Sequence, residues 1–155
     1  MFNKFIYLDN EIEKYFSSFE DPFKKIKEID GDVYRKTANR ITKKFELNNK
    51  AYFLKYHGPI GYAEILKNIL KFQLPTVSAR TEWNALQKLQ SKGINCPSPI
   101  AICSKGINPA KSHSFIITES LEPNISIEDA FELKVVNKIS AHEKKKVIER
   151  VGSIC

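Results

Sequence analysis

The stretch Ala51-Tyr52-Phe53-Leu54-Lys55-Tyr56-His57 decides how the rest of the chain is interpreted. Aromatic and aliphatic side chains surround one lysine, and a turn signal precedes them, so the stretch predicts a β-strand. A lysine in such a strand must extend its ammonium group to water, pair with a carboxylate or face a charged ligand. Taken alone, Lys55 fits a strand lysine that points to solvent, so a partner elsewhere in the chain decides its role.

A glutamate on a predicted helix is the candidate partner. The pattern predicts a helix over residues 78–91, capped by Ser78, in which Glu82, Leu86 and Leu89 are spaced i, i+4 and i+7. The carboxylate is therefore in line with the side chains that pack inward, where it needs a cation. By itself Glu82 also fits an ordinary first-turn glutamate that the helix dipole favours. We predict that Lys55 and Glu82 approach within salt-bridge distance.

The other apolar runs predict an α+β fold. Five strands are expected, at residues 33–36, 41–47, 51–57, 99–103 and 114–118, and helices at residues 11–19, 22–29, 62–72 and 78–91. The 62–72 helix has Leu66 and Leu70 on its apolar side. We predict one antiparallel sheet with the 78–91 helix packed on one face, followed by helices after about residue 122.

The composition of the chain limits the classes of protein to which it can belong. A chain of 155 residues with a net charge of +7 is long enough for one domain with a real core, and it suits an anionic partner such as a nucleotide, a phosphorylated glycan, a nucleic acid or a membrane surface. The three cysteines show no CxxC spacing, so the sequence suggests neither a disulfide framework nor a zinc site. The apolar run near the N-terminus is too short for a signal peptide, and we expect a cytoplasmic protein.

Two further helix starts are predicted near the end of the sequence. Ser126 with Asp129 marks one, and Ser140 with Glu143 forms a capping box that marks the other. The last helix carries an apolar stripe, which we expect to be exposed and to favour association of the chain; its members are Val147, Ile148, Val151 and Ile154.

Six short motifs, in order, carry a resemblance to a known family. They are Asp21-Pro22-Phe23, Gly31-Asp32-Val33-Tyr34-Arg35, Tyr52-Phe53-Leu54-Lys55, Glu82-Trp83-Asn84-Ala85, Asn108-Pro109 and Ser114-Phe115-Ile116-Ile117-Thr118-Glu119. Together they resemble the lipopolysaccharide core heptose(I) kinase family from about residue 20 onward. The order of the predicted strands and helices is that of the amino-terminal lobe of a protein kinase.

The resemblance implies a kinase-like amino-terminal lobe at residues 31–121, preceded by a helical extension at 1–30 and followed at 122–155 by the hinge exit and the start of a truncated helical lobe. It implies that Lys55 holds the phosphates of ATP, that Glu82 orients this lysine, and that the main chain of Glu119, Ser120 and Leu121 meets the adenine. The implied acceptor is a heptose of the lipopolysaccharide inner core, phosphorylated at the cytoplasmic face of the inner membrane, with peripheral membrane contact left open.

Two departures from the kinase pattern bear on activity. The turn at residues 37–40 has no glycine, so Arg40 either touches phosphate there or is a solvated turn arginine. The His-Arg-Asp segment and the acidic residue that would bind Mg²⁺ have no counterpart, and Asp129 and His142 do not replace them. We therefore expect an amino-terminal half of a kinase that has no catalytic residue and no metal ligands and does not turn over alone.

Other functions stay open at this point. Another sugar kinase of the superfamily, such as one acting on a Kdo residue, fits the same residues. A non-catalytic basic module derived from a kinase also fits. A nucleic-acid partner is not expected, because most aromatic residues lie in strand runs and arginine is scarce.

Overall fold

The chain is described by a computed structural model that covers residues 3–7, 9–17, 21–71, 78–108, 110–121 and 139–152. It divides into two compact units, Met1–Ser120 and Leu121–Cys155. The first unit contains the sheet, and the described part of the second contains helix α6 (Ala141–Gly152).

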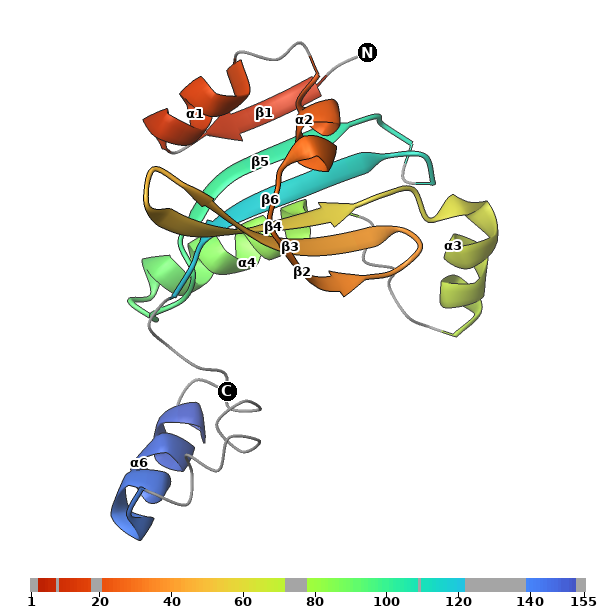
Figure 1. The fold of residues 1–155 in the computed structure, drawn as a ribbon. Helices are drawn as coiled ribbons and strands as arrows, with labels where there is room; N and C mark the ends of the chain where they lie inside the picture. The colour runs from red at the N-terminus through yellow and green to blue at the C-terminus, as the bar shows by residue number, and fades with distance from the viewer. Residues whose placement is uncertain are drawn as a thin grey trace. The chain divides into compact units, whose positions relative to one another are not determined.

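Within the described residues, six strands form one antiparallel sheet in the order β1-β5-β6-β4-β3-β2 (Figure 1). The strands are β1 (Asn3–Tyr7), β2 (Asp32–Lys36), β3 (Arg40–Leu47), β4 (Lys50–His57), β5 (Pro99–Lys105) and β6 (His113–Glu119). The five predicted strands are all present, and they lie in one sheet as predicted.

Strand β1 is the element that the sequence did not predict. It pairs with the outer edge of β5, from Asn3 opposite Lys105 to Tyr7 opposite Ala101. The expected helical extension at residues 1–30 therefore holds a strand as well as its two helices, α1 (Asn10–Ser17) and α2 (Pro22–Glu28). Unpaired backbone groups on the edge of β5 select this strand, which is a tertiary effect that local patterns do not report.

The helix starts follow their capping chemistry. Asp21 caps α2, where its carboxylate accepts a hydrogen bond of 3.0 Å from the N–H of Phe23, and Pro22 fills the first turn as predicted. Helix α4 (Arg80–Ser91) begins slightly later than expected, with Ala79 in the cap position. Ser78 still contributes, because its hydroxyl accepts a 3.2 Å hydrogen bond from the N–H of Arg80.

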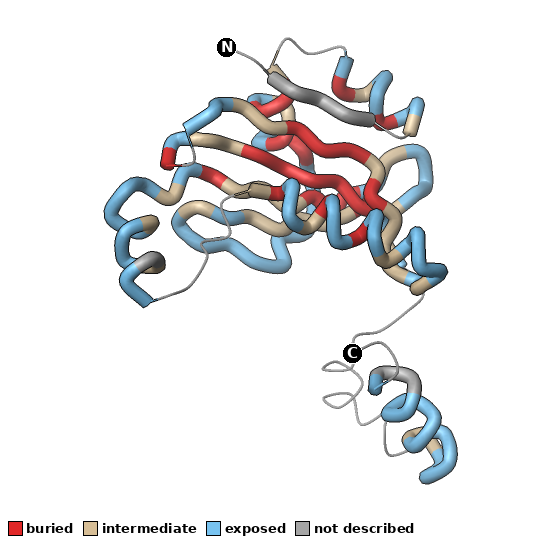
Figure 2. Tube along the Cα trace, turned by 180° about the vertical axis from the view of Figure 1, so that it is seen from behind, coloured by how far each residue is buried: buried red, intermediate tan, exposed pale blue. Residues whose placement is uncertain are grey.

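The sheet has two differently covered faces. On one face, α1 and α2 contribute Ile12, Phe16, Phe23 and Ile26 to a large apolar cluster. On the other face, α4 contributes Trp83 and Leu86 to a smaller cluster with Ile102 and Ile116. Figure 2 shows that burial is concentrated in strands β5 and β6. Strand β4 contributes the buried residues Tyr52 and Leu54. Because α4 packs against β5 and β6, the β3–β4 side of its face is left uncovered by that helix.

Two helices expose apolar residues. On α3 (Gly61–Leu70), Leu66 and Leu70 are exposed, although the sequence placed them on the apolar side of that helix. On α6, the predicted capping box is present, since Ser140 and Glu143 exchange hydrogen bonds, and Val147 and Ile148 are exposed as predicted. The predictions about Ser126, Asp129, Ile154 and the Val151 side chain lie outside the described residues. No helix among the described residues is long and apolar enough to cross a membrane.

Candidate functional site

Lys55 lies on the partly open face of the sheet. The register of β4 places it between Thr42 of β3 and Ile116 of β6. Its neighbours Leu54 and Tyr56 point to the opposite face, because successive strand residues alternate, and Leu54 is buried there in the apolar cluster. The side chain of Lys55 is thus directed away from the main core.

Glu82 reaches Lys55 from the first turn of α4. The Nζ atom of Lys55 donates to Oε1 of Glu82 at 2.5 Å, which confirms the predicted ion pair. Trp83 and Leu86 fix the rotation of α4 by packing on the sheet, so the carboxylate is positioned by the core beside it. The side chains are 38% and 30% exposed, so this pair faces an opening and is not sealed in the interior.

That opening is a cleft of about 1150 Å³. Its lining includes the turn at residues 37–40, the β-strand residues Thr42 and Lys55, and Glu82. Helix α3 contributes Glu64 and Asn68. Polar side chains from β3, β4, α3 and α4 therefore line the cleft together with the ammonium group of Lys55.

The turn over the cleft is tight although it has no glycine. The N–H of Thr37 donates to the carbonyl of Arg40 at 2.9 Å, and the N–H of Gly58 donates to the carbonyl of Asn39 at 2.6 Å. A Cβ atom at Gly58 would lie 3.3 Å from that same Asn39 oxygen, so the close approach favours glycine at this position. Arg40 also lines the cleft.

His57 also lines the cleft, and the sequence reasoning did not select it. Strand alternation was the available signal, because His57 follows Lys55 by two residues and its register partner is Arg40. Its Nδ1 atom is buried without a hydrogen-bond partner. Burial lowers the pKa of His57 below its ordinary value, the charge of Arg40 lowers it further, and Glu82 partly opposes them.

The predicted hinge residues lie apart from the cleft. None of Glu119, Ser120 and Leu121 is among the described residues that line it. The N–H of Glu119 donates to Ser98 at 2.9 Å, and the N–H of Ser120 donates to Ala51 at 2.9 Å. The N–H groups of Glu119 and Ser120 are thus already used inside the fold.

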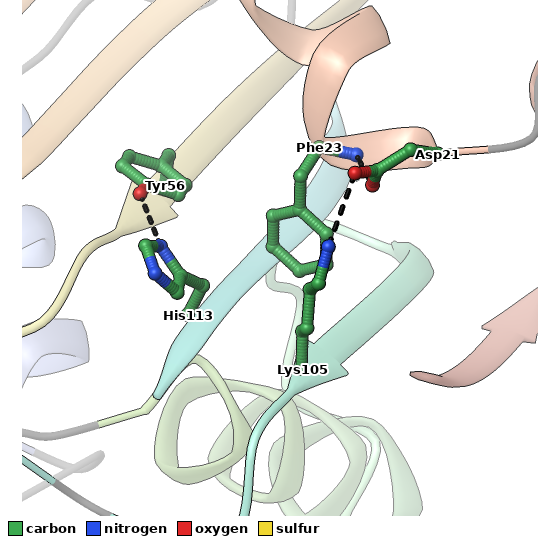
Figure 3. Close-up of polar contacts among 5 residues, drawn as sticks. All are labelled: Asp21, Phe23, Tyr56, Lys105 and His113. Atoms are coloured by element: carbon green, nitrogen blue, oxygen red, sulfur yellow. Dashed lines mark hydrogen bonds and ion pairs between the residues drawn. The ribbon is translucent and has the colours of Figure 1, made fainter. Parts of the chain in front are cut away.

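A polar cluster supports the end of β4 from the opposite face (Figure 3). The hydroxyl of Tyr56 lies 2.7 Å from Nδ1 of His113, and Lys105 forms a 3.0 Å ion pair with Asp21. Phe23 lies between these pairs, with its ring edge-on to His113 and Lys105 at 5.8 Å from its centre. The cluster ties α2 to three strands at the end of the sheet where β4 leads toward α3.

The described residues contain no group of three or more His, Cys, Asp or Glu side chains that could hold a metal ion.

Comparison with known proteins connects this geometry to a family. The model of the lipopolysaccharide kinase (Kdo/WaaP) family matches residues 24–155. The chain is 38% identical over 135 residues to the lipopolysaccharide core heptose(I) kinase WaaP of Escherichia coli, a match that takes in 87% of this chain and 51% of that protein. It is 40% identical over 108 residues to the same kinase of Pseudomonas aeruginosa, which takes in 70% of this chain and 40% of that protein.

A solved structure, WaaP in complex with acyl carrier protein, has the same arrangement of elements with a TM-score of 0.61 and 28% identity, over 81% of this chain and 44% of that chain. The chain thus has the α+β, protein-kinase-like fold that the sequence predicted. It spans about half the length of the curated E. coli relative. These matches identify the chain as a member of the lipopolysaccharide kinase (Kdo/WaaP) family.

Proposed function

We propose that this chain is the ATP-binding part of a kinase that phosphorylates a heptose of the lipopolysaccharide inner core. The observation that carries the proposal is the Lys55–Glu82 ion pair at the opening of a polar cleft. Phosphoryl transfer depends mainly on positioning and on stabilising negative charge. An ammonium group held in place by a carboxylate is suited to both tasks.

The cleft supplies more than one contact for an anion. Lys55 is proposed to meet the phosphates of ATP, Glu82 to hold Lys55 in position, and Arg40 to approach the phosphates from the β3 end of the turn. Because a guanidinium group donates from a planar fork, Arg40 can replace contacts that the backbone of a glycine-rich loop would provide. The 37–40 turn would close over the nucleotide.

The adenine is proposed to lie toward the segment 119–121. The N–H groups of Glu119 and Ser120 are engaged inside the fold, so recognition of the adenine would use other main-chain groups of this segment. In this proposal, residues 31–121 form the nucleotide-binding lobe and residues 122–155 begin the next lobe. The sequence has no His-Arg-Asp segment, so the roles assigned here are in binding and positioning.

Heptose is the favoured acceptor because the relatives that are 38% and 40% identical to the chain are named heptose(I) kinases. The matching family also includes kinases named for Kdo, which remains the second candidate acceptor. We place the reaction at the cytoplasmic face of the inner membrane, where the inner core would be within reach. Acyl carrier protein, present in the complex of the structural relative, is a further candidate partner for this basic chain.

Calorimetric titration of ATP tests the proposal. The Lys55→Met variant keeps the length of the side chain and removes its charge, so affinity should fall roughly 10- to 100-fold, the range for losing a charged hydrogen bond. The matched control is Lys50→Met on the same strand, because Lys50 is exposed and pairs with Glu11 at 3.8 Å away from the cleft. ATP binding that is absent, or equally strong in Lys55→Met and wild type, would overturn the proposed role of the cleft.

A further inference from the structure

Helix α3 carries an unusually exposed apolar row. Tyr62, Leu66 and Leu70 are spaced four residues apart, and their exposed fractions are 61%, 59% and 73%. A spacing of four residues places all three on one side of a helix. Single exposed apolar residues are common on protein surfaces. The row therefore indicates a binding surface only if the neighbouring residues also fit one.

The turn between β5 and β6 extends this row. Ile107 at its tip is 92% exposed. The N–H of Gly61 donates to the carbonyl of Ala110 at 3.1 Å, and the side chain of Asn108 is hydrogen-bonded to the hydroxyl of Tyr62. These bonds hold the turn against the start of α3, and Figure 1 shows both at the same end of the sheet. We call the four apolar residues, Tyr62, Leu66, Leu70 and Ile107, the α3 edge.

Basic side chains flank the α3 edge. Lys67 and Lys71 lie on the next row of the same helical segment, and Lys111 lies in the turn; all three are exposed. Lys67 makes one loose ion pair with Glu64, at 3.8 Å, which leaves it largely hydrated. Exposed leucine and isoleucine beside lysines match the boundary between acyl chains and anionic headgroups.

The other side of α3 lines the cleft. Glu64 and Asn68 are part of the lining that also includes Lys55. One short helix therefore borders the proposed phosphate site on one side and presents apolar and basic residues to the exterior on the other. A surface bound through the α3 edge would lie next to the opening of the cleft.

We propose that the α3 edge docks the chain on an anionic lipid bilayer. Apolar side chains would enter the headgroup region, and the lysines would contact lipid phosphates. This inference rests on the proposed function, because it explains how a kinase for a lipid-linked sugar reaches its acceptor: docking brings the cleft to the headgroup layer.

Flotation with vesicles of defined composition tests the inference. The 155-residue chain should float with vesicles of phosphatidylethanolamine and phosphatidylglycerol and should bind phosphatidylcholine vesicles about tenfold more weakly. The double variant Leu66→Ser/Leu70→Ser should lose about tenfold in binding, and Lys67→Gln/Lys71→Gln should lose the dependence on anionic lipid. Val33→Ser on the edge strand β2 is the matched control, because Val33 is also an exposed apolar residue.

The same variants distinguish the alternatives. ATP affinity should be unchanged in Leu66→Ser/Leu70→Ser, so a defect in vesicle binding alone concerns docking and not the nucleotide site. Vesicle binding that is absent, or equal in wild type and the double variant, would overturn the inference. The proposed ATP site would still stand, because ATP binding is measured separately. It would also be overturned if the double variant instead abolished self-association in sedimentation or binding of acyl carrier protein, with vesicle binding unaffected.

Discussion

The face of the sheet under α1 and α2 and the face under α4 differ in how completely a helix covers them. Under α1 and α2, aromatic and aliphatic side chains from four strands form a continuous cluster. Under α4, the cluster is small, and beyond it the same face continues as the polar cleft around Lys55. The comparison indicates that the closed face supplies most of the stability, whereas the open face can carry charge because solvent and a ligand can reach it.

The largest expected effect is on the closed face. Phe115 is fully buried and packs against Phe16 and Phe23, with ring centres 5.8 and 5.3 Å away. Phe115→Ala should lower the free energy of unfolding by about 3–5 kcal/mol, because it leaves a cavity in the cluster. Urea denaturation measures this. Lys55→Met should cost far less stability, and an equal loss for the two variants would break the contrast between the faces.

A smaller loss is expected at the polar cluster on the same face. Asp21→Ala removes the cap of α2 and the partner of Lys105, and it should cost about 1–2 kcal/mol. Asp30→Ala is the control, because Asp30 lies at an exposed site. Among the contacts described, its carboxylate accepts a hydrogen bond only from the N–H of the adjacent Gly31. If both variants have the same stability in urea denaturation, the capping and ion pair of Asp21 do not hold α2.

On the open face, substitutions should weaken ATP binding more than they lower the stability of the fold. The Lys55–Glu82 pair is about one-third exposed, so Glu82→Gln should cost only about 0.2–1 kcal/mol of unfolding free energy. ATP affinity should fall more, because Lys55 loses its orientation. A double-mutant cycle with Lys55→Met, read by calorimetry, should show that the two losses in ATP affinity are not additive. Additive losses would mean that Glu82 does not act through Lys55.

The smallest effect is expected from pH. Burial first, and neighbouring positive charges second, lower the folded-state pKa values of His57 and His113 below 6.5. As pH falls below 6.5, the unfolded chain takes up protons that the folded chain does not, so stability should decrease until the lowered pKa values are passed. In a denaturation series over about pH 5–7.5, His57→Gln and His113→Gln should each flatten this dependence.

The sequence was sufficient for what local pattern and chemistry determine. Aromatic and aliphatic residues after a turn signal located the strand of Lys55. Helical spacing predicted that Glu82 faces inward, and the Asp21-Pro22 pair located the start of α2. Strand β1 was missed because an edge partner selects it. His57 was not selected because its place beside Arg40 and the burial of its Nδ1 atom depend on the register of the folded strands.

Helix α3 shows a second limit of prediction from sequence. Helical periodicity placed Leu66 and Leu70 on one side of the helix but could not say whether that side would meet the sheet or remain outside. The hinge at residues 119–121 stays a prediction, and the resemblance gave no indication of the hydrogen bonds that engage Glu119 and Ser120. The position of α3 along the chain was predictable, whereas the surroundings of its two leucines were not.

The most direct test of the contrast between the faces is an NMR titration of the ¹⁵N-labelled chain with ATP, in which each backbone amide reports its own surroundings. The account predicts shifts in the turn at residues 37–40 and at Thr42, Lys55, His57 and Glu82, with Ile12 and Ile26 of the closed face unchanged. Shifts centred on α1 and α2, with the cleft amides unmoved, would contradict the central claim that the open face receives the nucleotide.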